Sequence, residues 1–153
     1  MWSDVGGCDF AMLIGKPEIC ARIPHAGAMC LLDSVLSWDD KHIACATGSH
    51  RAADNPLRRG GRLHTICGVE YAAQAMALHG GLTGGTQAQP RVGYLASLRE
   101  LVCRVAYLDL IEGDLLVRAE RLLDEGSRAI YWFTLSGKDG ELMSGRAAVV
   151  LEP

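Results

Sequence analysis

The sequence is short of several features that would by themselves define a class of protein. No apolar run reaches the eighteen or so residues that a membrane-spanning helix requires, and no internal repeat or low-complexity tract is present. Charged residues make up 22% of the chain and the net charge is only −3, which argues against general nucleic-acid binding. We therefore expect a soluble protein with neither a membrane nor a nucleic acid as its partner.

The six cysteines form no C-x-x-C pair. They are Cys8, Cys20, Cys30, Cys45, Cys67 and Cys103. The first residues, MWSDVGGCDF, also lack the basic segment followed by an apolar segment that a secretory signal has. We therefore expect a reducing, cytoplasmic environment in which each cysteine is a small buried apolar side chain. His64 and Cys67 alone are too few ligands to define a metal site, and no metal is expected.

The length of 153 residues fits one domain, spanning 1–153. A chain of this size buries about two-thirds of the surface that its unfolded form exposes, so neither disulfides nor a metal are needed for stability.

Strand-like runs dominate the chain, and only one long segment has helical spacing. The predicted strands cover residues 29–37, 42–47, 91–107, 114–122, 128–136 and 141–151, and a short helix is predicted at 17–21. A hairpin turn is predicted at 38–41. Within 91–107 the apolar positions change parity, which predicts a bulge near Arg99 and Glu100 that bends the sheet. Two strands, one helix and a meander of long strands predict an α+β fold.

The helical segment, TICGVEYAAQAMALH, runs from Thr65 to His79, with Thr65 as a plausible N-cap and Gly80-Gly81 as a stop. Its apolar stripe comprises Ile66, Val69, Ala73 and Met76 or Ala77, and Glu70 lies on the same face. Its alanines have small side chains, so a sheet could approach the helix axis closely. This pattern predicts a helix wrapped by a sheet.

Two ionisable residues stand out as candidates for chemistry. Pro24 restricts the backbone that enters His25, so the imidazole can be aimed reproducibly. Glu70 lies among apolar residues, where a carboxyl group either needs a partner or is held protonated, and a protonated carboxyl group is a general acid. The alternative for His25 is a partly buried ring whose nitrogen is satisfied by a backbone carbonyl.

Both segments resemble a known family. PHAGAMCLLDSV resembles the PHR-x-PMLLLDRV segment of the β-hydroxyacyl-carrier-protein dehydratases, and GVEYAAQAMA resembles their helix, in which a glutamate is followed four residues later by a glutamine. RVGYLASLREL and EGDLLVRAERL are also similar to this family, most of all to the dehydratases encoded in aryl polyene biosynthesis clusters. The resemblance covers roughly residues 18–153. The family's glycine-histidine-phenylalanine-proline stretch before the helix is replaced here by DNPLRRGGRLHT.

The resemblance implies the hotdog fold, a curved antiparallel sheet wrapped around one long central helix. It also implies that His25 is the catalytic base and Glu70 the catalytic acid, and that Gln74 supports Glu70. Thr65 and Ile66, where the helix begins, would offer backbone N–H groups to the substrate. The implied partners are an acyl carrier protein, which holds the substrate on its phosphopantetheine, and a second protomer in a homodimer or a heterodimer with another dehydratase-like subunit. No cofactor of its own is implied.

The implied reaction explains why both residue types are needed. Conversion of a 3-hydroxyacyl thioester to a trans-2-enoyl thioester removes an α-proton, for which imidazole has a suitable pKa. It also expels a hydroxyl group, which an acid must protonate. N–H groups at the start of the helix would stabilise charge on the thioester oxygen.

Two other functions remain open: a hotdog acyl thioesterase, and a non-catalytic partner subunit of another dehydratase. A basic loop at residues 51–62 adds a further expectation. Its arginines include Arg58, Arg59 and Arg62, and we expect these three to dock the acidic carrier protein.

Overall fold

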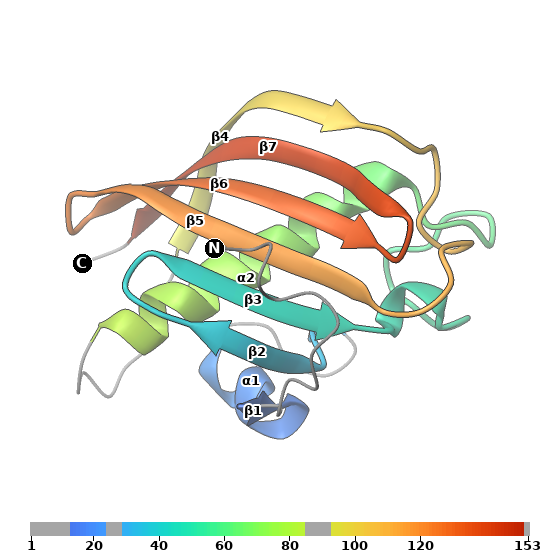
Figure 1. The fold of residues 1–153 in the computed structure, drawn as a ribbon, viewed down its shortest axis with the longest axis horizontal. Coiled ribbons are helices and arrows are strands. Elements are labelled where there is room, and N and C mark those ends of the chain that lie inside the picture. Colours follow the sequence, from blue (N-terminus) through green and yellow to red (C-terminus); the bar gives the residue numbers. More distant parts are fainter. Residues whose placement is uncertain (1–12, 24–28, 85–92, 152–153) are drawn as a thin grey trace.

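One antiparallel sheet is the largest structural unit of the described chain (Figure 1). The computed structural model describes residues 13–23, 29–84 and 93–151. The sheet has seven strands in the order β1-β2-β3-β5-β6-β7-β4. The strands are β1 (Ile14–Gly15), β2 (Ser34–Trp38), β3 (His42–Thr47), β4 (Gly93–Cys103), β5 (Leu115–Asp124), β6 (Arg128–Gly137) and β7 (Gly140–Leu151). The sheet curves around the long helix α2 (Gly68–Thr83), and the short helix α1 (Lys16–Arg22) lies beside β1 at one edge (Figure 1).

Alternation of side chains along the central strands places the core between the sheet and α2. In β6, Tyr131, Phe133 and Leu135 are buried, whereas the residues between them are half-buried. The same period of two runs through β5, as expected for strands with one face on the core. The predicted arrangement of a sheet wrapped around one helix is confirmed.

The helix differs from the prediction at both ends. Residues Thr65–Cys67 form a 3-10 turn before α2, and Thr65 is not a side-chain N-cap. Its hydroxyl donates instead to the carbonyl of Val105 at 2.7 Å. At the other end the predicted stop at Gly80-Gly81 is wrong, because α2 continues to Thr83. The hydroxyl of Thr83 donates to the carbonyl of His79 and accepts from Arg121, and these bonds stabilise the extra turn.

Each end of α2 is anchored to the sheet or to its loops. At the start, Thr65 N–H donates to the carbonyl of Ala106 at 3.0 Å. Near the end, the fully buried His79 contacts the carbonyl of Asp39 at 2.7 Å through Nε2 and the hydroxyl of Tyr131 at 2.8 Å through Nδ1. A carbonyl can only accept, so Nε2 carries the proton and Nδ1 accepts from Tyr131.

The predicted apolar stripe is mostly half-buried or exposed, and Met76, one of the two alternatives for its last position, is its buried member. Ile66 is 53% exposed, and Val69, Ala73 and Ala77 are half-buried with Glu70 among them. The deeply buried face carries instead Tyr71, Ala72, Gln74, Ala75, Met76, Leu78 and His79. Sequence spacing therefore identified a real apolar face, but the sheet of the same chain covers the neighbouring one.

Two strand boundaries also differ, and the predicted bulge is confirmed. β4 ends at Cys103 rather than at residue 107, and its pairing with β7 shifts between Arg99 and Val102, where Glu100 has a φ of 56°. β2 begins at Ser34 rather than at residue 29. The hairpin between β2 and β3 is as predicted, with the Asp39 carboxylate accepting from the backbone N–H groups of Lys41 and His42.

Within the described ranges, no helix is both long and apolar enough to cross a membrane. No three potential metal ligands come together in the same ranges.

Candidate active site

Glu70 lies in the first turn of α2, on its half-buried face. One helical turn later, the Gln74 amide nitrogen lies 3.3 Å from a Glu70 carboxylate oxygen and donates to it. Residues four apart in a helix face the same side, so this contact follows from the sequence spacing. The predicted support of Glu70 by Gln74 therefore has a geometric basis in the structure.

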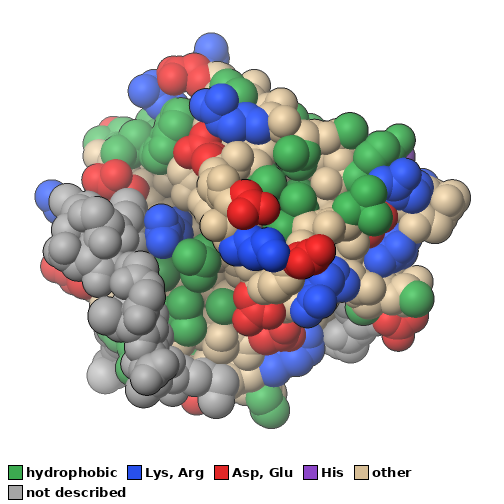
Figure 2. Space-filling view, turned by 45° about the vertical axis from the view of Figure 1, so that its right-hand side comes forward, with side chains coloured by type: hydrophobic (Ala, Val, Ile, Leu, Met, Phe, Trp, Pro, Cys, Tyr) green, Lys and Arg blue, Asp and Glu red, His purple; other side chains and the backbone are tan. Residues whose placement is uncertain are grey.

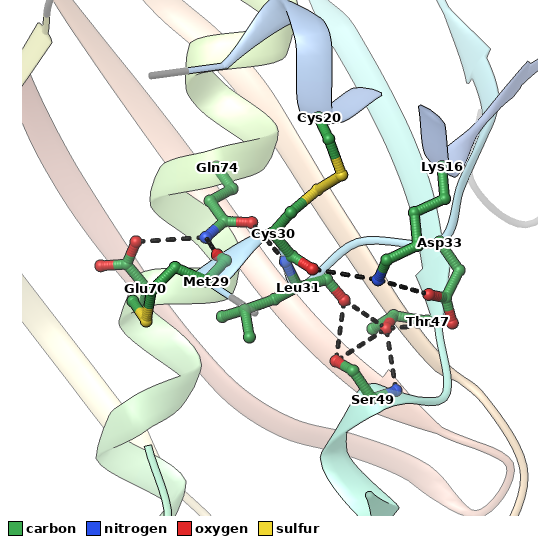
Figure 3. Close-up of a disulfide and its surroundings, with 10 residues drawn as sticks. All are labelled: Lys16, Cys20, Met29, Cys30, Leu31, Asp33, Thr47, Ser49, Glu70 and Gln74. Atoms are coloured by element: carbon green, nitrogen blue, oxygen red, sulfur yellow. Dashed lines mark hydrogen bonds and ion pairs between the residues drawn. A yellow bond between two sulfur atoms is a disulfide. The ribbon is translucent and has the colours of Figure 1, made fainter. Parts of the chain in front are cut away.

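Gln74 also joins α2 to the chain that follows His25 (Figure 3). Its side chain is fully buried. The amide oxygen accepts from Leu31 N–H at 2.9 Å, and the amide nitrogen donates to the carbonyl of Met29 at 2.6 Å. A single side chain thus satisfies two backbone groups of the segment at residues 29–33 and also contacts Glu70.

The other side of this segment is held by hydroxyl groups and a lysine. The carbonyl of Leu31 accepts from Thr47 at 2.6 Å and from Ser49 at 2.7 Å. The carbonyl of Cys30 accepts from Lys16 at 3.0 Å. Residues 29–33 were predicted to be the start of a strand. They are irregular because side chains rather than a neighbouring strand satisfy most of these backbone groups.

Behind Ser49 lies a buried polar network that the sequence did not reveal. The Ser49 hydroxyl is 2.9 Å from the hydroxyl of Tyr71, and the Asn55 amide donates to the same Tyr71 oxygen at 3.0 Å. Burial raises the pKa of Tyr71 against the opposing effect of these two hydrogen bonds, so its hydroxyl stays neutral. The three residues come from β3–α2 connections and from α2 itself, and no local pattern links them.

Cys20 and Cys30 form a disulfide, with their Cα atoms 5.6 Å apart. This corrects the expectation that every cysteine is a free, buried side chain. The reason is tertiary: α1 packs beside residues 29–33 and brings the two cysteines within bonding range. Among the described cysteines, Cys45, Cys67 and Cys103 are free, and burial raises the pKa of Cys45 to about 12.

His25 falls in residues 24–28, outside the described part of the chain. Its predicted pairing with Glu70 therefore stays a prediction. In the sequence it precedes Met29 by four residues, and Met29 is one of the two residues that Gln74 holds.

The two residues predicted to offer N–H groups differ in their surroundings. Thr65 is 2% exposed, and both its N–H and its hydroxyl donate to the chain between β4 and β5. This contradicts the expectation that the Thr65 N–H faces a substrate; the residue instead fixes the start of the helix. Ile66 is 53% exposed, beside Glu70 on the half-buried face.

The three predicted docking arginines also differ from one another. Arg58 donates to the carbonyls of Ala52 at 2.8 Å and Gly61 at 2.7 Å, so it stabilises its own loop. Arg62 pairs with Asp109 at 3.0 Å. Arg59 is exposed and donates to the carbonyl of Arg58 at 3.0 Å.

The acidic partner of Arg62 is ionised. Burial opposes ionisation of Asp109, but hydrogen bonds from Leu63 N–H and the Arg62 side chain outweigh it and lower the pKa of Asp109. Arg62 also lies 3.6 Å over the ring of Tyr107. Of the three predicted docking residues, Arg59 is the exposed one, and Arg58 and Arg62 are half-buried.

Comparison with known proteins identifies the family. The model of the ApeP-like family, described as ApeP dehydratase, matches residues 17–153. The chain belongs to the ApeP-like dehydratase family. This confirms the resemblance found in the sequence.

Solved structures agree on the hotdog fold. "The Dehydratase Heterocomplex ApeI:P from Xenorhabdus doucetiae" matches with a TM-score of 0.77 and 21% identity, over 88% of this chain and 91% of that one. A mutant thioesterase, PA1618 of Pseudomonas aeruginosa, matches with a TM-score of 0.64 and 14% identity, over 94% and 98% of the two chains. Thioesterase superfamily member 2 of zebra fish matches with a TM-score of 0.61 and 18% identity, over 90% and 95%. No curated protein matches this chain by sequence.

Proposed function

We propose that this member of the ApeP-like dehydratase family removes water from a 3-hydroxyacyl thioester carried on an acyl carrier protein, giving the trans-2-enoyl thioester. The acyl carrier protein supplies the phosphopantetheine arm, and the chain itself needs no cofactor or metal. The reaction is proposed to serve fatty acid, polyketide or aryl polyene synthesis in the cytoplasm.

In this proposal His25 takes the α-proton and Glu70 gives a proton to the leaving hydroxyl group. The observation that carries it is the link from Glu70 through Gln74 to Met29 and Leu31. His25 precedes Met29 by four residues in the sequence, and four residues of extended chain span at most about 14 Å, so the proposal is compatible with the length of the chain between them. In this proposal Gln74 supports Glu70 directly and also holds the segment that follows His25 in the sequence.

A second dehydratase-like subunit is proposed to complete the site. The half-buried face of α2, with Glu70 among apolar residues, is left open by the sheet of its own chain. On the edge strand β4, Tyr94, Leu95 and Val102 are exposed. Exposed apolar groups on an edge strand favour association with another chain. The similar ApeI:P structure is described as a dehydratase heterocomplex, which supports a different dehydratase-like subunit as the partner; a second copy of this chain is the alternative.

Carrier docking is proposed to depend on local charge rather than on the field of the whole molecule. On the face in Figure 2, basic and acidic side chains are interspersed and neither sign dominates. Arg59 is exposed, and it is close enough to Cys67, next to the start of α2, to influence the pKa of that thiol. We therefore assign the docking contact chiefly to Arg59.

The test is an assay with a 3-hydroxyacyl carrier protein, run on the chain alone and with the cognate second subunit. Product analysis by mass distinguishes loss of one water from release of a free thiol, which a thioesterase would give. Glu70→Gln keeps the shape of the side chain but cannot donate the proton, so turnover should fall by about two to four orders of magnitude.

Glu125→Gln, at an exposed turn between β5 and β6, is the matched control and should retain full activity. Near-normal turnover by the Glu70→Gln variant would refute the catalytic assignment. Full activity of Glu70→Gln in the presence of an active second subunit would instead identify the chain as a non-catalytic partner.

A further inference from the structure

The Cys20–Cys30 disulfide is connected to the candidate site by a continuous series of contacts (Figure 3). Cys30 lies between Met29 and Leu31, and Gln74 binds the backbone of both. Gln74 in turn donates to Glu70. The other end of the disulfide lies on α1. The bond therefore attaches α1 directly to the segment to which Gln74 is hydrogen-bonded.

We propose that this disulfide is a thiol–disulfide switch, reduced and reformed by dithiols, that sets the position of the 29–33 segment and with it the activity of the Glu70 site. The inference rests on the proposed dehydratase function for its effect on rate, although its effect on the segment is independent of that function. The oxidised form holds the segment to α1, and the reduced form releases one of its attachments.

The two sulfur atoms are unequally accessible, as a reversible switch requires. Cys20 is half-buried, whereas Cys30 is 2% exposed. Cys20 is therefore the more accessible partner, and in the proposed switch an incoming thiolate attacks its sulfur and Cys30 is the leaving group. Reactivity in thiol–disulfide exchange depends on such access to one particular sulfur.

The fold does not need the disulfide as a structural staple. Ile19 and Ile23, at α1, are 0% and 5% exposed and belong to the main core, so α1 is held without the covalent bond. The bond closes a short local loop, with a sequence separation of 10, instead of joining distant parts of the chain. In the cytoplasmic location proposed above, a disulfide that persists or cycles is usually redox-sensing or catalytic rather than structural.

The dithiol supplies the two electrons that reduce the disulfide. Its first thiolate attacks the Cys20 sulfur, which forms a mixed disulfide and expels the Cys30 thiolate, and that thiolate takes a proton from water. The second thiolate of the reagent then attacks the mixed disulfide and releases Cys20. The protein disulfide is reduced by two electrons to two thiols, and the dithiol is oxidised to a cyclic disulfide. An oxidised dithiol reagent reverses both steps.

The expected effect on rate is intermediate in size. After reduction, hydrogen bonds from Gln74, Thr47 and Ser49 still hold the segment. A displacement of 1 Å at a catalytic group can cost about 100-fold in rate, and we expect a smaller fall in kcat, about tenfold, because those bonds remain.

The experiment compares the full chain with Cys20–Cys30 oxidised and reduced, with the state of each cysteine assigned by alkylation and peptide mass. Hydrogen exchange at the Leu31 amide reports on the segment, and exchange at the Phe133 amide, in the centre of β6, reports on global unfolding. Dehydration kinetics report on the site. The Cys20→Ser variant should show the exchange rate and kcat of the reduced form, and dithiols should change neither. The Cys103→Ser variant, which lacks an exposed free thiol, should respond to dithiols as the wild type does.

Reduction should accelerate exchange at Leu31 without changing Phe133, and should lower kcat with little change in KM. Unchanged exchange at Leu31 after complete reduction would overturn the proposal, as would a pair that cannot be oxidised. Faster exchange with unchanged kcat in an active enzyme would overturn the link to activity. If no preparation is active with any partner, the dehydratase proposal fails, and the Leu31 result still decides whether the disulfide positions the segment.

Discussion

Replacement of Gln74 by methionine tests the buried link between α2 and residues 29–33. Methionine fills a similar volume but neither donates nor accepts the three hydrogen bonds that Gln74 makes. Leu31 is 1% exposed, so its N–H would be left buried without a partner, at a cost of about 1–3 kcal/mol. Met29 is half-buried, so its carbonyl can accept a hydrogen bond from water instead, and loss of the bond to Gln74 adds at most about 1 kcal/mol to the cost.

The summed loss in the free energy of unfolding is therefore about 1–4 kcal/mol, which corresponds to a fall in Tm of roughly 3–15 °C for a chain of this size. Urea unfolding should show a lower midpoint with an unchanged m-value. Val69→Met, on the half-buried face of the same helix, lengthens a side chain without removing a hydrogen bond and should change stability by no more than about 0.5 kcal/mol. A Gln74→Met protein as stable as this control would refute the reasoning.

Two further predictions concern acid stability and carrier docking. Burial lowers the pKa of His50 and His79 below the ordinary value of 6.5 despite hydrogen bonds to carbonyl groups, so below about pH 6.5 the unfolded chain takes up protons that the folded chain does not. This contribution to the free energy of unfolding is fully present above pH 6.5. As the pH decreases below 6.5, it falls by at most about 1.4 kcal/mol per pH unit for each histidine. A Tm that is equal at pH 7.5 and pH 5.5 would contradict this prediction. Arg59→Glu should slow turnover of the carrier-bound substrate several-fold at low salt and spare a short pantetheine thioester. Arg128→Glu, at the start of β6 and distant from the 51–62 loop, should affect neither. Equal loss on both substrates would mean that Arg59 acts on the site itself.

The elements that could be predicted from sequence are those set by local patterns. The β2–β3 hairpin follows from the turn chemistry of Asp39, and the Glu70–Gln74 contact follows from helical spacing. The bulge in β4 was visible as a change of apolar parity beside Glu100. Each of these features depends on residues that are close together along the chain.

The features that could not be predicted depend on residues far apart in the chain. The 29–33 segment has apolar residues typical of a strand, but its hydrogen-bond partners, Gln74, Thr47 and Ser49, come from other elements. The Cys20–Cys30 bond requires that α1 pack against this segment, which no cysteine spacing implies. The docking role expected for Arg62 was drawn from charge alone, without knowledge that Asp109 neutralises it.

The two anchors of α2 also restrict how this protein can change during evolution. Thr65 fixes the first end and His79 the second, and Glu70 lies between them. A residue inserted or deleted between the anchors would rotate the following helix by about 100° and shift it by about 1.5 Å, so that one anchor or the orientation of Glu70 would be lost. The length of this helix is therefore expected to stay constant among functional descendants. Under the proposed function, new acyl preferences should arise through substitutions on its half-buried face or in the proposed second subunit.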